Sequence, residues 1–252
     1  MPPYTLPPYS TSEIEVAAFI VLPLLIVALL AWGTLAAWRR AGATAARARR
    51  VMLLVSLGAA AWMSATWTVA SRGTFLDFTL TPPPFAGLVA GVIVLSVVIA
   101  LSPLGRRLAS LPLWVLVAVQ GFRLPLELAM HRLAERGIMP EQMSYSGRNF
   151  DIVTGITALV VAALVWRGLA GPGLVRLWNL MGLALLANIV TVAIISTPRF
   201  AAFGPDRVNV FVMVTPFVWL PAVLVLAALA GHLLIFRALR APFRTASAAP
   251  AY

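Results

Sequence analysis

The sequence predicts an all-α integral membrane protein, and three observations lead to this fold class. Hydrophobic residues make up 61 % of the 252 residues, and charged residues make up only 11 %. Typical soluble domains carry about 25 % charged residues, so we expect lipid to be the solvent for most of this chain. Seven apolar stretches are long enough to cross a bilayer as helices, which takes about 20 residues each. We place these spans near 14–38, 51–70, 84–103, 112–134, 151–169, 177–197 and 209–235.

Shorter segments flank the predicted spans at both ends of the chain. Residues 1–13 are rich in proline, which predicts an irregular extracytoplasmic lead-in. Ser12 and Glu15 have the spacing of a capping box, which would satisfy the first free amides of the first helix. Residues 14–238 form one predicted transmembrane domain, because the connections between the spans are short. Residues 239–252 form a predicted cytoplasmic tail.

The charge of the connections predicts the orientation. Twelve arginines fall on one side of a seven-span topology, and basic connections face the cytoplasm. We therefore expect the N-terminus outside and the C-terminus in the cytoplasm. Seven of the eight acidic residues fall on or near the opposite side. The net charge of +11 is then mainly a topology signal, and we expect no nucleic-acid partner. The twelve arginines are Arg39, Arg40, Arg47, Arg49, Arg50, Arg106, Arg107, Arg167, Arg176, Arg237, Arg240 and Arg244.

The chain contains neither cysteine nor lysine. The lack of cysteine excludes disulfides, thiolate metal sites and a cysteine nucleophile. The lack of lysine excludes a retinal Schiff base and the lysine of a phosphate-binding P-loop. The use of arginine instead of lysine, together with abundant alanine, valine, glycine and proline, suggests a GC-rich bacterial genome. The expected location is therefore the bacterial cytoplasmic (inner) membrane.

The fourth predicted span carries a stripe of polar side chains. Gln120, Arg123, Glu127 and His131 fall within an arc of about 80° on an ideal helix, and Glu135 extends the same face. An arginine at the middle of a bilayer costs at least about 2.5–3.5 kcal/mol on insertion scales, so the stripe should face the bundle interior. Glu127, four residues after Arg123, is the expected ionic partner.

A proline inside the same stretch predicts a local break of the helix. Pro125 has no amide hydrogen and clashes with the carbonyl of Gly121, so we expect a kink near 121–125. Two interpretations of the stripe follow. Arg123 and Glu127 could form a structural ion pair that locks helix packing, or the stripe could line a polar cavity open to the outside.

The connection that follows the stripe, residues 136–151, is rich in turn formers and hydrogen-bonding side chains. Asn149 or Asp151 is expected to cap the fifth span. Tyr145 and Arg148 would join these two residues over the outer mouth of the predicted cavity. The alternative is a capped turn without a ligand.

Two motifs carry a resemblance to a known family. GFRLPLE at residues 121–127 and QMSYSGRNFDI at 142–152 resemble a family of uncharacterised bacterial multi-pass membrane proteins. The motifs belong to a small part of the chain, and the resemblance implies no activity, ligand or fold. It favours one shared site for the two stretches.

Other polar or helix-breaking residues predict packing more than chemistry. Pro216 and Pro221 should bend or break the seventh span. Asn188 and Asn209 are expected to form hydrogen bonds between helices. His131 and His232 lie near opposite ends of their spans, which excludes joint ligation of one metal or haem iron. We expect no metal and no cofactor.

The function predicted first is binding or passage of a small polar or anionic solute in an outward-facing intramembrane pocket. The candidate ligand-binding residues are Gln120, Arg123, Glu127, His131, Glu135, Tyr145, Arg148, Asn149 and Asp151. An intramembrane enzyme that acts on a lipid or isoprenoid-like substrate is the first alternative, with Glu127 or His131 as its acid or base. A non-catalytic assembly subunit or sensor, with the stripe against a membrane partner protein or a second copy, is the other.

Overall fold

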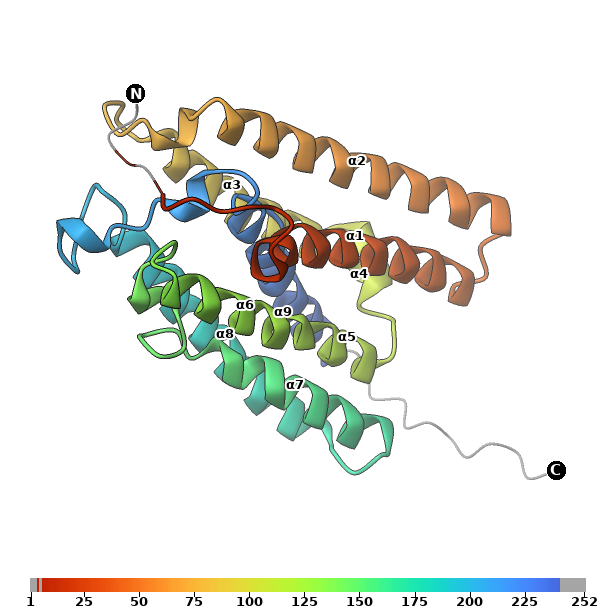
Figure 1. The fold of residues 1–252 in the computed structure, drawn as a ribbon. Coiled ribbons are helices and arrows are strands. Elements are labelled where there is room, and N and C mark those ends of the chain that lie inside the picture. Colours follow the sequence, from red (N-terminus) through yellow and green to blue (C-terminus); the bar gives the residue numbers. More distant parts are fainter. Residues whose placement is uncertain (1–3, 5, 241–252) are drawn as a thin grey trace.

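The computed structural model describes residue 4 and residues 6–240, and this part of the chain is helical without any strand. The predicted all-α fold class is confirmed. Residues 241–252 of the predicted tail, which include Arg244, and residues 1–3 and 5 of the predicted lead-in lie outside the described residues. The α-helices are α1 (Ile14–Arg40), α2 (Ala45–Ser71), α3 (Pro84–Leu101), α4 (Pro103–Leu108), α5 (Leu113–Val119), α6 (Arg123–Glu135), α7 (Asp151–Trp166), α8 (Pro172–Ile195) and α9 (Leu226–Ala238) (Figure 1).

Within the described residues, six helical segments are long and apolar enough to cross a membrane, which indicates a polytopic membrane protein. The stretch predicted as the span 151–169 is the helix α7, which has only 16 residues. At 1.5 Å per residue it is about 24 Å long, less than the roughly 30 Å of a hydrocarbon core. The six segments are Ile14–Arg40, Ala45–Ser71, Pro84–Leu101, Leu113–Glu135, Pro172–Ile195 and Leu220–Ala238.

Short one-turn helices lie between and within these segments. A 3₁₀ turn, η2 (Gln120–Phe122), joins α5 to α6, and it stands where Pro125 predicts a kink. The other 3₁₀ turns are η1 (Thr74–Leu76), η3 (Glu141–Met143), η4 (Pro205–Arg207) and η5 (Phe211–Met213). A π-helix, η6 (Leu220–Val225), precedes α9 directly.

The last predicted stretch, 209–235, becomes helical later than its hydropathy suggests. Residues 208–210 are not helical, η5 follows, and continuous helix begins only near Leu220. Pro216 and Pro221 explain this delay, because each removes a backbone donor from the hydrogen-bond ladder. The prolines therefore set where this helix begins.

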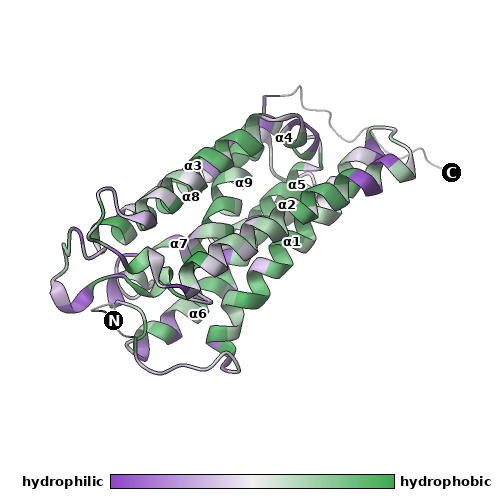
Figure 2. Cartoon of the chain, turned by 90° about the horizontal axis from the view of Figure 1, so that it is seen from above, coloured by the Kyte–Doolittle hydropathy of each residue, from purple (hydrophilic) through white to green (hydrophobic). Residues whose placement is uncertain are grey.

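The helices form a bundle in which α9 is central and α2 is peripheral. The helix α9 packs against α3, α5 and α8, and α7 packs against α5, η2, α6 and α8. The helix α2 lies at one edge and packs mainly on α1, which leaves most of its surface exposed (Figure 1). The sides of the bundle are hydrophobic and the hydrophilic residues gather mainly near its ends (Figure 2).

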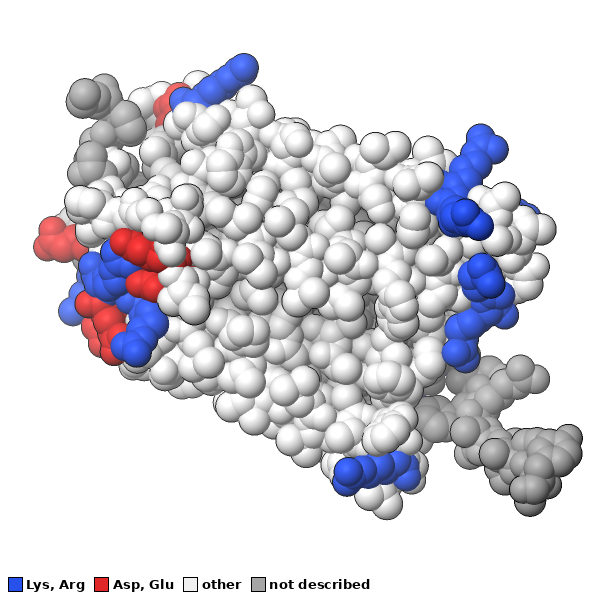
Figure 3. Space-filling view, turned by 45° about the vertical axis from the view of Figure 1, so that its right-hand side comes forward, with Lys and Arg blue, Asp and Glu red and all other residues white. Residues whose placement is uncertain are grey.

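The two ends differ in charge. On the face drawn in Figure 3, one end carries acidic and basic side chains together, and the other carries only basic ones. The mixed end includes Arg136, which lies 2.6 Å from both Glu13 and Glu15. The hydrogen bond from Arg136 holds the pKa of Glu13 below its ordinary value. Because Glu15 binds Arg136 and Ser12 bonds to Ser10, the predicted capping box is wrong.

The core consists of two hydrophobic clusters with a polar layer between them. The larger cluster includes Leu126 and Met130 of α6, and the smaller includes Trp178 of α8 and Leu234 of α9. Along α8 and α9, Asn179 and His232 stand between residues of the two clusters, and both are buried. The polar layer therefore crosses the middle of the bundle.

Two indole hydrogen bonds hold the π-helix against α2. Trp62 of α2 donates to the carbonyl of Ala222 at 2.8 Å, and Trp219 donates back to the carbonyl of Met63 at 3.1 Å. A third helix contributes through Ser96 of α3, whose hydroxyl lies 2.7 Å from the carbonyl of Val92 in its own helix and 3.2 Å from the carbonyl of Leu226. Side chains from two neighbours thus bind carbonyls in and just after the irregular segment.

Trp62→Phe is expected to destabilise the protein by about 0.5–1.5 kcal/mol, because the Ala222 carbonyl loses a buried donor while most of the ring remains. The measurement is the free energy of unfolding in mixed micelles with increasing sodium dodecyl sulfate, followed by circular dichroism. Trp67→Phe is the matched control, since Trp67 packs against Trp219 with tilted rings and 4.8 Å between ring centroids, and its side chain has no hydrogen bond among the described residues. Equal losses in the two variants would contradict this role of Trp62.

Candidate functional site

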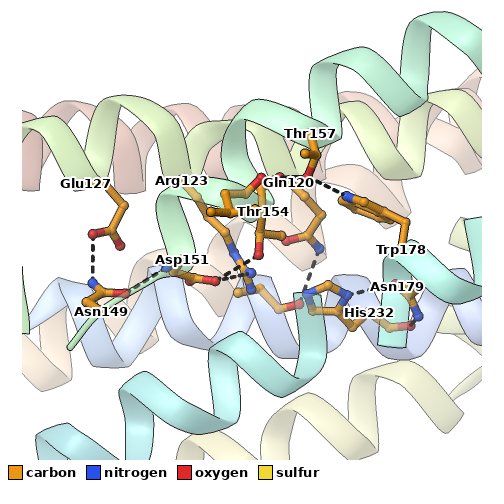
Figure 4. Close-up of polar contacts among 12 residues, drawn as sticks. Gln120, Arg123, Glu127, Asn149, Asp151, Thr154, Thr157, Trp178, Asn179 and His232 are labelled. Atoms are coloured by element: carbon orange, nitrogen blue, oxygen red, sulfur yellow. Dashed lines mark hydrogen bonds and ion pairs between the residues drawn. The ribbon is translucent and has the colours of Figure 1, made fainter. Parts of the chain in front are cut away.

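The ionic partner of Arg123 is Asp151 and not Glu127. Arg123 Nη1 lies 2.8 Å from Asp151 Oδ1, and both side chains are buried (Figure 4). The predicted pair of Arg123 with Glu127 is wrong, because α7 brings a carboxylate to the guanidinium from across the bundle. Arg123 is the first residue of α6, and Asp151 is the first residue of α7.

A glycine explains why α7 lies so close to α6. A Cβ atom on Gly155 would lie 2.5 Å from the amide nitrogen of Leu124 and 3.0 Å from the carbonyl carbon of Arg123. Only a residue without a side chain permits this backbone approach. The same approach places Asp151, one helical turn before Gly155, next to Arg123.

Asn149 connects Glu127, the preceding loop and the start of α7. Its amide nitrogen donates to Glu127 Oε2 at 2.7 Å and to the carbonyl of Met143 at 3.0 Å. Its amide oxygen accepts from the backbone amide of Asp151 at 3.0 Å. The N-cap position of α7 is occupied by Phe150, which makes no side-chain cap hydrogen bond, so neither Asn149 nor Asp151 is the expected cap. The structure thus brings the stripe and the loop together through four buried side chains: Arg123, Glu127, Asn149 and Asp151.

His131, Glu135 and Tyr145 form a separate group at the mixed-charge end. His131 stacks on Tyr145 with 4.3 Å between ring centroids, and its Nδ1 lies 3.0 Å from the hydroxyl of Ser144. His131 Nε2 lies 3.4 Å from Glu135. All three side chains are partly or fully exposed. This group is not part of the buried cluster.

Arg148 also points elsewhere. Its guanidinium lies over the ring of Phe203 at 5.2 Å, and its backbone carbonyl accepts from Asn188 at 2.8 Å. The hydrogen bond expected from Asn188 to another helix is therefore made to the loop that contains Arg148. Asn209, which lies between η4 and η5, donates to the carbonyl of Ala193 in α8 at 3.2 Å.

Gln120 lies in the polar layer with residues that the stripe did not include. It is buried and donates to the carbonyl of Ala228 in α9 at 3.3 Å. Thr154 donates to Asp151 at 3.1 Å, and a Cβ on Gly182 would lie 2.9 Å from Thr154 and 2.7 Å from His232. These contacts bring the imidazole of His232 into the layer (Figure 4).

The hydrogen bonds of Asn179 define the tautomer of His232. Asn179 Nδ2 donates to the backbone carbonyl of His232 at 3.1 Å, so its Oδ1 faces His232 Nδ1 at 2.7 Å. The Nδ1 atom must then carry the proton, and Nε2 of the neutral ring presents a lone pair. The sequence signal that could have predicted this layer is one polar residue in each of three apolar helices, namely Thr154 in α7, Asn179 in α8 and His232 in α9.

Several buried atoms of the layer have no hydrogen-bond partner among the described residues: Gln120 Oε1, Arg123 Nε, Arg123 Nη2 and His232 Nε2. The two arginine nitrogens are donors, and the other two atoms are acceptors. This set is chemically complementary, and each unpaired buried group costs about 1–3 kcal/mol. The layer is therefore a region of high polarity and incomplete pairing inside an apolar bundle.

A cavity of about 340 Å³ adjoins the buried cluster. Arg123, Glu127, Asn149 and Asp151 line one part of it. Apart from Thr191, the other lining residues are apolar and come mainly from α3, α6, α8, η6 and α9. The volume lies within the range of about 300–1,000 Å³ that is usual for small-molecule sites.

The cavity lies between two helices that do not cover each other. In the described part of the chain, α3 packs on α9 and η6 and α8 packs on α7 and α9, but these two helices form no comparable contact with each other. Ile93 of α3 and Ala187 and Thr191 of α8 line the cavity and are exposed on the side of the bundle. A ligand could therefore enter from the hydrocarbon of the membrane.

The described residues include no group of three or more His, Asp or Glu side chains placed to hold a metal ion. No family model, curated protein or solved structure matches the chain. This result agrees with a resemblance that implies no function, and the site has to be interpreted from its own geometry.

Proposed function

We propose that this protein binds a lipid-class amphiphile in the cavity between α3, α8 and α9. The cavity itself is the observation that carries the proposal, because four polar side chains line one part of it and, apart from Thr191, apolar side chains line the rest. A small polar solute would leave most of this wall without a partner. An amphiphile matches it, with its polar head at the buried cluster and its chain along the apolar helices.

Glu127 is the residue that we expect to bind the head group. Asn149 occupies Glu127 Oε2, and no described residue donates to Glu127 Oε1. A head group with a hydroxyl or amino group would donate a hydrogen bond to this Oε1 atom. Arg123 and Asp151 form an ion pair that holds α6 and α7 together, so we assign them the role of positioning Glu127 and Asn149.

The proposed orientation places the mixed-charge end outside and the arginine-rich end in the cytoplasm of a bacterial inner membrane. Arginines at the end of α1, at the start of α2, on α4 and around the α7–α8 connection support it, because basic residues that flank spans stay in the cytoplasm. In this topology α7 is a short seventh crossing, and the head-group cluster opens toward the outer half of the membrane.

Catalysis on the bound amphiphile is the second candidate function, and the position of Glu127 favours it. A carboxyl group in the wall of an apolar cavity, beside a ligand head, is placed to act as a general acid or base. In that case Glu127→Gln lowers turnover of the bound ligand by far more than it lowers binding.

Native mass spectrometry of the protein released from a mild detergent tests the proposal. We expect a reproducible extra mass that tandem fragmentation identifies as a lipid or isoprenoid. Ala187→Trp should remove it by filling the cavity, whereas Ala184→Trp on the same helix should not, because Ala184 is exposed and does not line the cavity. Glu127→Gln should weaken binding by about tenfold or more, since a buried polar group left without its partner costs about 1–3 kcal/mol.

The other outcomes separate the alternatives. A bound polar metabolite that survives Ala187→Trp would overturn the amphiphile proposal and favour a solute carrier. A bare chain of 26.9 kDa would contradict a tightly held ligand. A stoichiometric protein partner without any small molecule would favour the assembly subunit.

A further inference from the structure

A second cavity of about 410 Å³ lies on the other side of α9. Its walls come from α1, α2, α3, α4, α5, η6 and α9, and no residue lines both cavities. Two indoles, Trp32 and Trp62, line it, and the N–H of Trp62 already donates to Ala222. The other lining residues are apolar, and among the described residues the wall has no charged side chain, so this cavity suits a hydrocarbon chain better than a head group.

The cavity is open on the side of the bundle formed by α2, which packs mainly on α1 and is otherwise largely exposed. Trp32 of α1 and Gly58 of α2 line it, and both are exposed. A Cβ atom on Gly58 would meet no other atom within 4 Å. The hydrocarbon that reaches this opening in a membrane is an acyl chain of a neighbouring lipid.

The helices that wall the cavity also carry a dense group of exposed arginines, which we call the arginine rim. It stands at the end of α1, at the start of α2 and on α4, at the end of the bundle where Figure 3 shows only basic side chains. The sequence has no acidic residue between 16 and 76 or between 78 and 126 to neutralise it. The rim consists of Arg39, Arg40, Arg47, Arg49, Arg50, Arg106 and Arg107.

The rim and the cavity are close enough for one lipid to use both. Eight residues separate Arg50 from Gly58 on α2, which is about 12 Å along a helix. On α4, Arg106 and Arg107 stand between Leu104 and Leu108, and both leucines line the cavity. The guanidinium of Arg107 lies over the ring of Trp38 at 6.0 Å, which places it beside the end of α1.

We propose that the second cavity binds one acyl chain of an anionic phospholipid whose phosphate lies on the arginine rim. The apolar wall selects the chain, and the uncompensated positive charge selects the anionic head. This site is independent of the proposed amphiphile site, because the two cavities share no residue and lie on opposite sides of α9.

Titration of the purified protein with defined lipids, read by native mass spectrometry, tests this proposal. The probes are phosphatidylglycerol and phosphatidylcholine with the same acyl chains. We expect phosphatidylglycerol to bind at least tenfold more tightly. The double variant Arg106→Gln/Arg107→Gln should lower the ratio of the two lipid affinities by about tenfold. The matched control Arg167→Gln/Arg176→Gln removes the same charge from the α7–α8 side and should keep the preference.

A second set of variants tests whether the acyl chain binds in the second cavity. Gly58→Leu fills the second cavity and should weaken both lipids to the same extent, whereas Gly87→Leu on α3 should not, because Gly87 lines neither cavity and has open space around it. Ala59→Leu, also in the cavity wall, replaces Gly58→Leu if that variant does not fold. Equal binding of the two lipids, equal losses in the two arginine variants, or unchanged binding after the cavity is filled would each overturn the proposal.

Discussion

Asp151→Leu is expected to lower the free energy of unfolding by about 3–5 kcal/mol, because it leaves a buried guanidinium without its counter-ion. Arg123 is only 1 % exposed, and its described ionic contact is the 2.8 Å pair with Asp151. The variant also removes the acceptor of Thr154. Unfolding in mixed micelles with increasing sodium dodecyl sulfate measures the loss.

The control for this prediction replaces the other buried carboxylate. Glu127→Leu removes a hydrogen bond from Asn149 but leaves the pair of Arg123 and Asp151 intact, so we expect the smaller cost of about 1.5–3 kcal/mol. The double variant Arg123→Met/Asp151→Leu should recover much of the stability, because an apolar pair leaves no charge unpaired. A larger effect of Glu127→Leu than of Asp151→Leu would show that the pairing described here is incorrect.

Gly155→Ala is expected to destabilise the protein by about 1–3 kcal/mol or more, because it adds a methyl group where no space exists. The new Cβ would meet the backbone of α6 at Leu124 and Arg123, and neither contact involves a flexible side chain. The two helices must then separate, which lengthens the contact between Arg123 and Asp151. We therefore expect loss of the bound amphiphile together with loss of stability, measured by native mass spectrometry and by unfolding in mixed micelles.

Gly87→Ala is the matched control for this substitution. Gly87 is also helical, but a Cβ there would meet nothing within 4 Å. Alanine favours helix over glycine by up to about 1 kcal/mol, so this variant should be neutral or slightly more stable. If both glycine variants behave alike, helix propensity and not the contact of α6 with α7 controls the effect at Gly155.

The burial of the inner part of the stripe could be predicted from the sequence alone, but its hydrogen bonds and ion pairs could not. Helical periodicity correctly places Gln120, Arg123 and Glu127 in the bundle interior. The same periodicity suggests Glu127 as the partner of Arg123, because it considers only neighbours on one helix. The competing carboxylate is 28 residues away, and it reaches Arg123 because Gly155 lets two backbones approach. The spacing of residues along one helix contains no information on how closely a second helix approaches it.

The sequence by itself determined the all-α class, most of the apolar segments long enough to span a membrane, and the separation of twelve of the nineteen arginines from most acidic residues. These properties follow from length, hydropathy and charge, which are sums over local residues. Only the tertiary structure decided that His131, Glu135 and Tyr145 stand apart from the buried cluster and that His232 and Asn179 join the polar layer. It also decided where the two cavities lie. The physical reason is that cavities and buried polar contacts depend on how side chains of different helices pack, and that packing is non-local.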